Sequence, residues 1–310
     1  MSHSFIHTEL SKKIKFKEFA PMALKQMSLG VKDSTRKDLE SRLQRLLIPH
    51  FGNIQIKNIT PLQVERWQSN LTLTGGSDIT RRTKQLLKNI FDRAIVYELI
   101  KENPTTPTSK IRDTRAEQRE IYTKEEVSLM LSGSDGWLRL FILTMVSLGL
   151  RSSELTGIKF SDIDWRNKKI HIQRNIKWGQ ISLPKNGLTR WVDIPQDLLK
   201  EFDKAYIKRI EQNPKQDYIF ITPNRGSYWS DASTITKNYF KPLLQRLKIE
   251  YKTLYSLRHT YATLSLQGGQ KISYISEQLG HKDIKTTWDY YIKYLQDDND
   301  LNRANNILSF

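Results

Sequence analysis

The chain has 310 residues, which is enough for two domains that each bury a hydrophobic core. Lys and Arg number 50 against 33 Asp and Glu, and the formal net charge of +17 favours a polyanionic partner such as nucleic acid. The longest apolar run, Leu140 to Leu150, is shorter than the roughly 20 residues that span a bilayer, so a membrane protein is not expected. The sequence shows no cleavable leader and has no cysteine, which excludes disulfides and thiolate chemistry, and we expect a cytoplasmic protein.

Four stretches between residues 15 and 103 carry apolar residues at helical spacing, each bounded by helix start or stop signals. They cover about residues 16–27, 34–47, 61–71 and 80–99. The second is expected to end at Pro49 and Gly52, because proline disfavours a helical conformation in the residue before it. The third begins with Thr60-Pro61-Leu62-Gln63, which combines a capping hydroxyl, an N1 proline and an N3 glutamine. These stretches predict a helical N-terminal domain, preceded by an extension of residues 1–14.

The polar side of the fourth predicted helix is basic: it carries Arg81, Arg82, Lys84 and Lys88. Such a charge run is either an ordinary solvated helix face or a surface that contacts DNA phosphates. The residues that follow, 104–120, are rich in Pro, Thr, Lys and Arg and poor in apolar residues, which predicts a linker.

Residues 121–295 combine helices with strands. Thr123 and Glu126 form a capping box, and a strongly apolar helix over residues 137–148 ends at Gly149. Apolar and polar residues then alternate over 169–173, 180–183 and 190–194, with turn residues between, which predicts a three-stranded antiparallel sheet. We therefore expect a mainly α protein in which a mixed α/β C-terminal domain contains a small antiparallel sheet.

Five residues of this second domain are candidates for chemistry. Arg151 directly follows the apolar helix, and Glu154 could hold its guanidinium in a forked geometry; an ordinary surface ion pair is the alternative. Arg258 lies on a predicted helix. His281 follows Leu-Gly at a helix start, and Tyr290 lies nine residues after that histidine.

The order of these two arginines, the Leu-Gly-His sequence and the tyrosine resembles the tyrosine recombinase (phage integrase) family. The resemblance covers about residues 15–295, because three motifs of the first domain are similar to the core-binding domain of that family. These motifs are Pro49-His50-Phe51-Gly52, Ile59-Thr60-Pro61 and Glu102-Asn103-Pro104. The resemblance implies that the first domain holds one face of a DNA duplex.

The resemblance also implies roles for single residues. Tyr290 would be the nucleophile, and Arg151, Arg258 and His281 would bind the scissile phosphate. A lysine on the second hairpin would be the general acid; Lys185 is the best positional match.

Two positions leave questions open. Lys177 is a second, poorer match for the general acid. Three residues before Arg258, where the family usually has histidine, this chain has Tyr255. Its hydroxyl can hydrogen-bond a phosphate oxygen, but it is a poor proton shuttle near neutral pH.

The implied reaction conserves the phosphodiester bond energy as a 3′-phosphotyrosyl ester and needs neither ATP nor a cofactor. No carboxylates with metal-ligand spacing occur, so no metal is expected. The implied substrate is double-stranded DNA, and recombination requires a homotetramer on two DNA sites. Accessory DNA-bending or directionality proteins are further candidate partners. The tail of residues 296–310 is suited to dock on a neighbouring subunit or to pack on its own domain.

The expected role is that of an integrase of a phage or mobile element, acting in the bacterial cytoplasm at the nucleoid. A chromosome-dimer-resolving recombinase of the same fold, a topoisomerase, and a relative that binds DNA without catalysis are the alternatives. Tyr255 is the feature that hints at the last of these.

Overall fold

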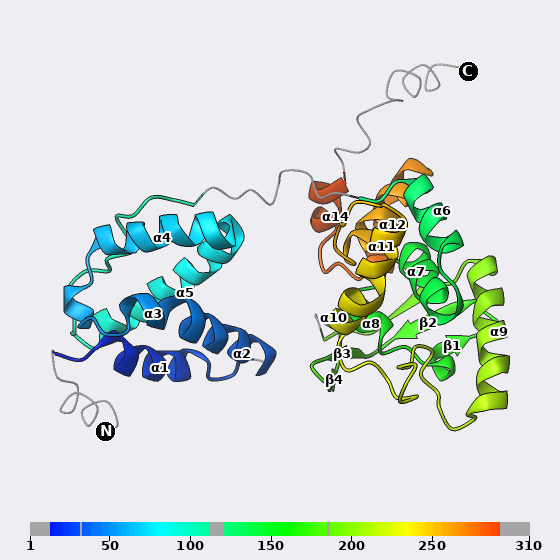
Figure 1. The fold of residues 1–310 in the computed structure, drawn as a ribbon, viewed down its shortest axis with the longest axis horizontal. Helices are drawn as coiled ribbons and strands as arrows, with labels where there is room; N and C mark the ends of the chain where they lie inside the picture. Colours follow the sequence, from blue (N-terminus) through cyan, green and yellow to red (C-terminus); the bar gives the residue numbers. More distant parts are fainter. Residues whose placement is uncertain (1–12, 32, 112–120, 185–186, 292–310) are drawn as a thin grey trace, which may run out of the picture. The chain divides into compact units, whose positions relative to one another are not determined.

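The computed structural model describes residues 13–31, 33–111, 121–184 and 187–291 (Figure 1). The chain divides into two units, Met1–Gln118 and Arg119–Phe310, and each contains its own hydrophobic core. The predicted tail of residues 296–310 lies outside the described residues, as does the predicted N-terminal extension apart from residues 13 and 14.

The first unit is a helical bundle built around an aromatic core. Phe16, Phe51 and Phe91 are almost fully buried at its centre, and Trp67 packs on Phe51 with ring centroids 5.7 Å apart. The elements are α1 (Phe16–Met27), α2 (Asp33–Arg42), the π-helical turn η1 (Leu43–Leu47), α3 (Ile48–Phe51), the 3-10 turn η2 (Ile56–Asn58), α4 (Pro61–Gly75) and α5 (Ser77–Val96).

Helix starts in this unit follow the local sequence. The N–H of Gln63 donates to Thr60 Oγ1 at 3.3 Å, and the N–H of Thr60 donates to Gln63 Oε1 at 2.9 Å, so the predicted capping box of α4 is confirmed. Contrary to prediction, Pro49 does not end the second helix, which widens into η1 and continues as α3; the helix ends at Phe51, directly before the predicted stop at Gly52. Pro49 has no N–H to donate to the preceding turn of this continuous helix, and the π-helical turn η1 lies directly before α3.

Residues 103–109 pack on the first unit, although their composition predicted a linker from residue 104. Asn103 Nδ2 donates to the carbonyl of Lys88 on α5 at 3.0 Å. The carbonyl of Ser109 accepts from Lys84 Nζ on α5 at 2.8 Å and from Gln68 Nε2 on α4 at 3.1 Å. The polar residues that suggested a linker are therefore partners for the side chains of two helices.

In the second unit, the helix α7 is central and contacts α6, α8, α9 and α12. The elements before the sheets are α6 (Lys124–Ser132), α7 (Gly136–Leu148), α8 (Ser152–Leu155) and the 3-10 turn η4 (Phe160–Asp162). Those after them are α9 (Gln196–Gln212), α10 (Ala232–Ile235), the π-helical turn η5 (Thr236–Phe240), α11 (Lys241–Arg246), α12 (Ser256–Gln267), α13 (Ile272–Leu279) and α14 (Ile284–Tyr291).

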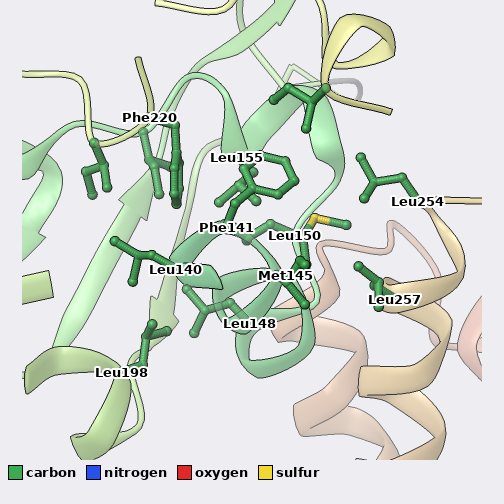
Figure 2. Close-up of a cluster of buried hydrophobic side chains, with 14 of the residues drawn as sticks. Leu140, Phe141, Met145, Leu148, Leu150, Leu155, Leu198, Phe220, Leu254 and Leu257 are labelled. Atoms are coloured by element: carbon green, nitrogen blue, oxygen red, sulfur yellow. The ribbon is translucent and has the colours of Figure 1, made fainter. Parts of the chain in front are cut away.

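The core of the second unit surrounds the apolar face of α7. Figure 2 shows Phe141, Met145 and Leu148 of α7 in one cluster with Leu155 of α8 and Leu257 of α12, and all five are fully buried. Burial of five such side chains fixes the C-terminal end of α7, from which the chain continues into the candidate site.

Two small antiparallel sheets replace the single predicted one. β2 (Lys169–Ile172) pairs with β1 (Ile163–Asp164) and with β5 (Arg190–Asp193), whereas β3 (Asn175–Lys177) and β4 (Gln180–Ser182) form a separate hairpin. The predicted three-stranded arrangement of 169–173, 180–183 and 190–194 is therefore wrong. Between β2 and β3, Arg174 Nε donates to the carbonyl of Gly157 at 3.1 Å, which holds the chain away from the first sheet. The predicted fold class, mainly α with a small antiparallel sheet, is confirmed.

Candidate active site

Arg151 lies where the central helix α7 ends. Gly149 has a φ of 60°, a left-handed conformation that glycine adopts without a steric penalty. Arg151 then becomes the N-cap of α8: its backbone N–H donates to Glu154 Oε2 at 3.0 Å, and its Nη1 donates to Oε1 at 2.7 Å. These hydrogen bonds hold Arg151 at the start of α8. Its side chain is 17% exposed, so the guanidinium also reaches the surface.

Glu154 is fully buried and is held by a second arginine, Arg190, at the start of β5. Arg190 donates from Nη1 to Oε1 at 3.2 Å and from Nη2 to Oε2 at 2.9 Å. Burial raises the pKa of Glu154, but Arg190, followed by Arg151 and Arg258, outweighs that effect and lowers the pKa to about 2. The carboxylate is therefore ionised at neutral pH and shared between two guanidiniums.

Arg258, on α12, is completely buried and connects the ends of two other helices. Its Nη1 donates to the carbonyl of Gly149, after α7, at 2.7 Å, and its Nη2 donates to the carbonyl of Leu279, the last residue of α13, at 2.7 Å. Burial lowers the pKa of this guanidinium. Its Nε is buried and has no acceptor among the described residues, an arrangement that costs about 1–3 kcal/mol and is suited to a nearby anion.

His281 is oriented by hydrogen bonds at both ring nitrogens. Its Nε2 lies 3.1 Å from Arg258 Nη2, and its Nδ1 lies 2.7 Å from Thr287 Oγ1 on α14. Because a guanidinium can only donate, Nε2 is the acceptor, and in the neutral imidazole Nδ1 donates to the threonine. His281 thus joins Arg258 to α14, the helix on which Tyr290 lies three residues after Thr287. The side chain of Tyr290 lies outside what the structure describes.

Arg151 and His281 line a cavity of about 180 Å³. Pro184 and Leu188 line it as well, so the connection between β4 and β5 borders the same space. The predicted general acid, Lys185, belongs to this connection and lies outside the described residues. The structure therefore brings Arg151, Arg258 and His281 together.

Tyr255 is the N-cap of α12 and is 39% exposed. Its ring centroid lies 5.9 Å from Arg258 Cζ, so the tyrosine stands beside the buried guanidinium. His259 is buried and meets Tyr255 edge-on, with ring centroids 4.9 Å apart.

The predicted DNA-binding residues of α5 differ in their surroundings. Arg81 and Arg82 each pair with Asp78 at 2.9 Å, and Lys88 pairs with Asp92 at 2.7 Å; all these side chains are substantially exposed. Lys84 is half-buried and donates to backbone carbonyls, and desolvation lowers its pKa although Glu65 opposes this. Lys84 thus anchors residues 108 and 109, whereas Arg82 and Lys88 are exposed and Arg81 is partly exposed.

Sequence reasoning did not identify Arg190. A signal was present in β5: at a spacing of two, Arg190 lies on the same face of the strand as Val192 and Ile194, which are buried. A basic residue on the buried face of a strand predicts a buried acidic partner. The other unidentified partners, the carbonyls of Gly149 and Leu279, carry no side-chain signal.

The described part of the chain contains no group of three or more His, Asp or Glu side chains that could hold a metal ion. Within the same residues, no helix is long and apolar enough to cross a membrane.

The family model described as the phage integrase family matches residues 120–297, and that of the phage integrase central domain matches residues 16–110, so the chain belongs to the phage integrase family.

Known proteins resemble the chain over most of its length. A protein of Caldanaerobacter subterraneus subsp. tengcongensis described as tyrosine recombinase XerC-like is 27% identical over 268 residues, which cover 77% of this chain and 68% of that protein. Among solved structures, the Tn1549 transposon integrase in complex with transposon right end DNA has a TM-score of 0.77 at 21% identity and covers 95% of this chain and 99% of that one. A lambda integrase tetramer bound to a Holliday junction has a TM-score of 0.74 at 18% identity and covers 97% and 85%. At these identities the two solved structures establish the fold.

Proposed function

We propose that this protein is a site-specific recombinase that cleaves and rejoins DNA strands through a 3′-phosphotyrosyl intermediate at Tyr290, as the integrase of a phage or mobile element. The observation that carries this proposal is the cluster of Arg151, Arg258 and His281, held in place by backbone carbonyls and by Glu154. It presents fixed positive charge in a partly buried site, which is what a phosphorane transition state requires.

The reaction follows from the chemistry of these residues. The oxygen of Tyr290 attacks the scissile phosphorus, a phosphotyrosyl bond forms, and the bond to the 5′ oxygen breaks. Lys185 gives that oxygen its proton. The two guanidiniums meet the charge that develops on the non-bridging oxygens, and His281 keeps Arg258 oriented. A 5′ hydroxyl from the partner strand then reverses the step.

Tyr255 is proposed to donate a hydrogen bond from its hydroxyl to a phosphate oxygen, because its side chain is exposed beside Arg258. Without an imidazole here, deprotonation of the nucleophile depends on other groups or on solvent.

The proposed substrate is double-stranded DNA, gripped by the basic face of α5 and by the second unit. Exchange between two duplexes requires four active sites, so a homotetramer on two DNA sites is proposed, together with accessory DNA-bending or directionality proteins. The fold shared with integrases solved on transposon DNA and as a tetramer on a Holliday junction supports the DNA substrate and the tetramer.

The test is covalent trapping on a nicked duplex whose short 5′ fragment is lost after cleavage. Wild type is expected to accumulate a protein–DNA adduct, and Tyr290→Phe to bind the duplex without forming one. Tyr291→Phe is the matched control and should form the adduct. Loss of the adduct in Tyr291→Phe instead would assign the nucleophile to the neighbouring tyrosine, and no adduct with wild type would favour a DNA-binding protein without catalysis. Cleavage of the element's own junction rather than a chromosomal site separates the integrase role from chromosome-dimer resolution.

A further inference from the structure

Arg190 donates hydrogen bonds from three nitrogens of its guanidinium. Nη1 and Nη2 donate to the two carboxylate oxygens of Glu154, and Nε donates to the carbonyl of Gln278 on α13 at 2.9 Å. The side chain is only 11% exposed. Three nitrogens of one side chain are thus fixed by two different elements.

Gly280 leaves the space in which this guanidinium lies. A Cβ atom on Gly280 would stand 2.9 Å from the Cδ, Nε and Cζ atoms of Arg190, closer than real Cβ contacts allow. With the Gln278 carbonyl on one side and the bare glycine backbone on another, the end of α13 holds Arg190 in a single orientation. The glycine before His281 therefore serves Arg190 as well as the turn.

Arg190 and Arg151 compete for the same carboxylate. Arg190 occupies both oxygens of Glu154, so the side chain of Arg151 makes one hydrogen bond to Glu154, from Nη1 to Oε1. Its Nη2 makes a long hydrogen bond of 3.5 Å to the carbonyl of Gly280, at the edge of the cavity that both residues line. Without Arg190, Glu154 would be a buried carboxylate with two oxygens for one guanidinium, and a bidentate pair with Arg151 would form. That pair would turn Arg151 away from the phosphate.

We propose that Arg190 is a positioning residue: by occupying Glu154 it keeps the guanidinium of Arg151 directed at the scissile phosphate. This inference rests on the proposed recombinase function and deepens it. Lysine cannot replace Arg190, because one ammonium cannot bridge both oxygens of Glu154 and the Gln278 carbonyl at once.

The experiment compares Arg190→Lys with Arg174→Lys. Arg174 is the matched control: it pairs with the buried Asp162 and donates from Nε to a backbone carbonyl, outside the site. In single-turnover cleavage of the nicked duplex, Arg190→Lys is expected to be about 10–100-fold slower, with DNA affinity changed by less than about threefold. Arg174→Lys is expected to cleave like wild type. Equal rates for the two variants would overturn the proposal.

A substrate with sulfur in place of the bridging 5′ oxygen identifies the step affected. A thiolate leaves without a proton donor, so this substrate should restore cleavage by Lys185→Ala. Cleavage by Arg190→Lys should stay slow, because the charge that develops on the non-bridging oxygens facing Arg151 is unchanged. Restoration of Arg190→Lys would mean that Arg190 acts on the leaving group, against the proposal.

Arg190→Gln in a Glu154→Gln background removes both charges and covers the case in which Arg190→Lys does not fold. If Arg190 acts through Glu154, the second substitution should lower cleavage by less than about threefold, since coupled residues are not additive. If Arg190→Gln slows cleavage in this background as strongly as Arg190→Lys is expected to slow it alone, the proposal is overturned. Failure of wild type to form any adduct would instead refute the recombinase function, so the two failures are distinct.

Discussion

Substitution of Gly149 by alanine should damage both the stability and the chemistry of the second unit. A Cβ atom there would lie 2.3 Å from Cδ1 of Tyr261 and 2.8 Å from Cδ2 of Leu279, and both side chains are buried. The left-handed φ of 60° costs about 1–2 kcal/mol for alanine. Overpacking against the ring and the leucine adds about 1–3 kcal/mol, so Gly149→Ala should lose about 2–5 kcal/mol.

Gly226→Ala is the control, because Gly226 has a φ of +62° and nothing within 4 Å of its added Cβ. It should lose only the backbone cost of about 1–2 kcal/mol. Six of the seven tryptophans lie in the second unit, with only Trp67 in the first, so fluorescence during urea unfolding reports mainly on the unit of interest.

Cleavage gives the second measurement. The carbonyl of Gly149 accepts from Arg258 Nη1, so a shift of the backbone at Gly149 also moves the support of this arginine. Gly149→Ala should therefore cleave more slowly than Gly226→Ala under conditions where both are folded. Equal losses of stability in the two variants would show that Tyr261 and Leu279 move aside freely, and the packing argument would then fail.

Three further predictions follow from charge and hydrogen bonding. The pKa of Glu154 is lowered from 4.5 to about 2, so the stability that its carboxylate contributes is present above pH 4.5 and is lost as the pH falls toward 2. Between pH 5 and pH 3 the free energy of unfolding, measured in urea, should therefore fall by about 2 kcal/mol more for wild type than for Glu154→Gln. Equal losses would contradict the ion-pair account. DNA affinity should fall by about 10³ or more between 50 and 200 mM salt if six or more phosphates are contacted, and a flat titration would argue against the basic face of α5 as a DNA surface. Tyr255→Phe should slow single-turnover cleavage, whereas Tyr255→His should be tolerated and should add a group that titrates near pH 6.5. If Tyr255→Phe cleaves like wild type from pH 5.5 to 8.5, Tyr255 only packs beside Arg258.

The parts of the fold that sequence predicted are those set by neighbouring residues. The capping boxes at Thr60 and Thr123 and the stop at Gly149 depend on spacings of a few residues, and each is present in the structure. Alternation predicted that residues 180–183 form a strand but could not name its partner, because a period of two fixes the face of a strand and leaves its neighbour open.

In the candidate site too, sequence patterns identified residues but not the distant groups that hold them. Arg151 and His281 were identified at helix ends and Arg258 on a predicted helix, in a family order, whereas their supports come from elsewhere in the chain. Arg190 reaches Glu154 across 36 positions, and the carbonyl of Gly149 reaches Arg258 across 109. Backbone acceptors look alike at every position, so only the packing of α7, α12 and α13 determines which of them meets a guanidinium.

The anchoring of Ser109 to α4 and α5 sets a limit on the span between the two units. Ser109 is held by side chains of α4 and α5, and in the second unit the N–H of Tyr122 donates to Thr260 Oγ1 at 2.9 Å and its hydroxyl donates to the carbonyl of Lys252. From 109 to 122 there are 122 − 109 = 13 residue steps, so these two anchors can never be more than about 47 Å apart. Once either unit is bound to DNA, the other is confined to a small volume at an effective concentration on the order of a few millimolar. If each unit binds DNA weakly, as proposed, it can dissociate and rebind while the other unit holds the chain on its site.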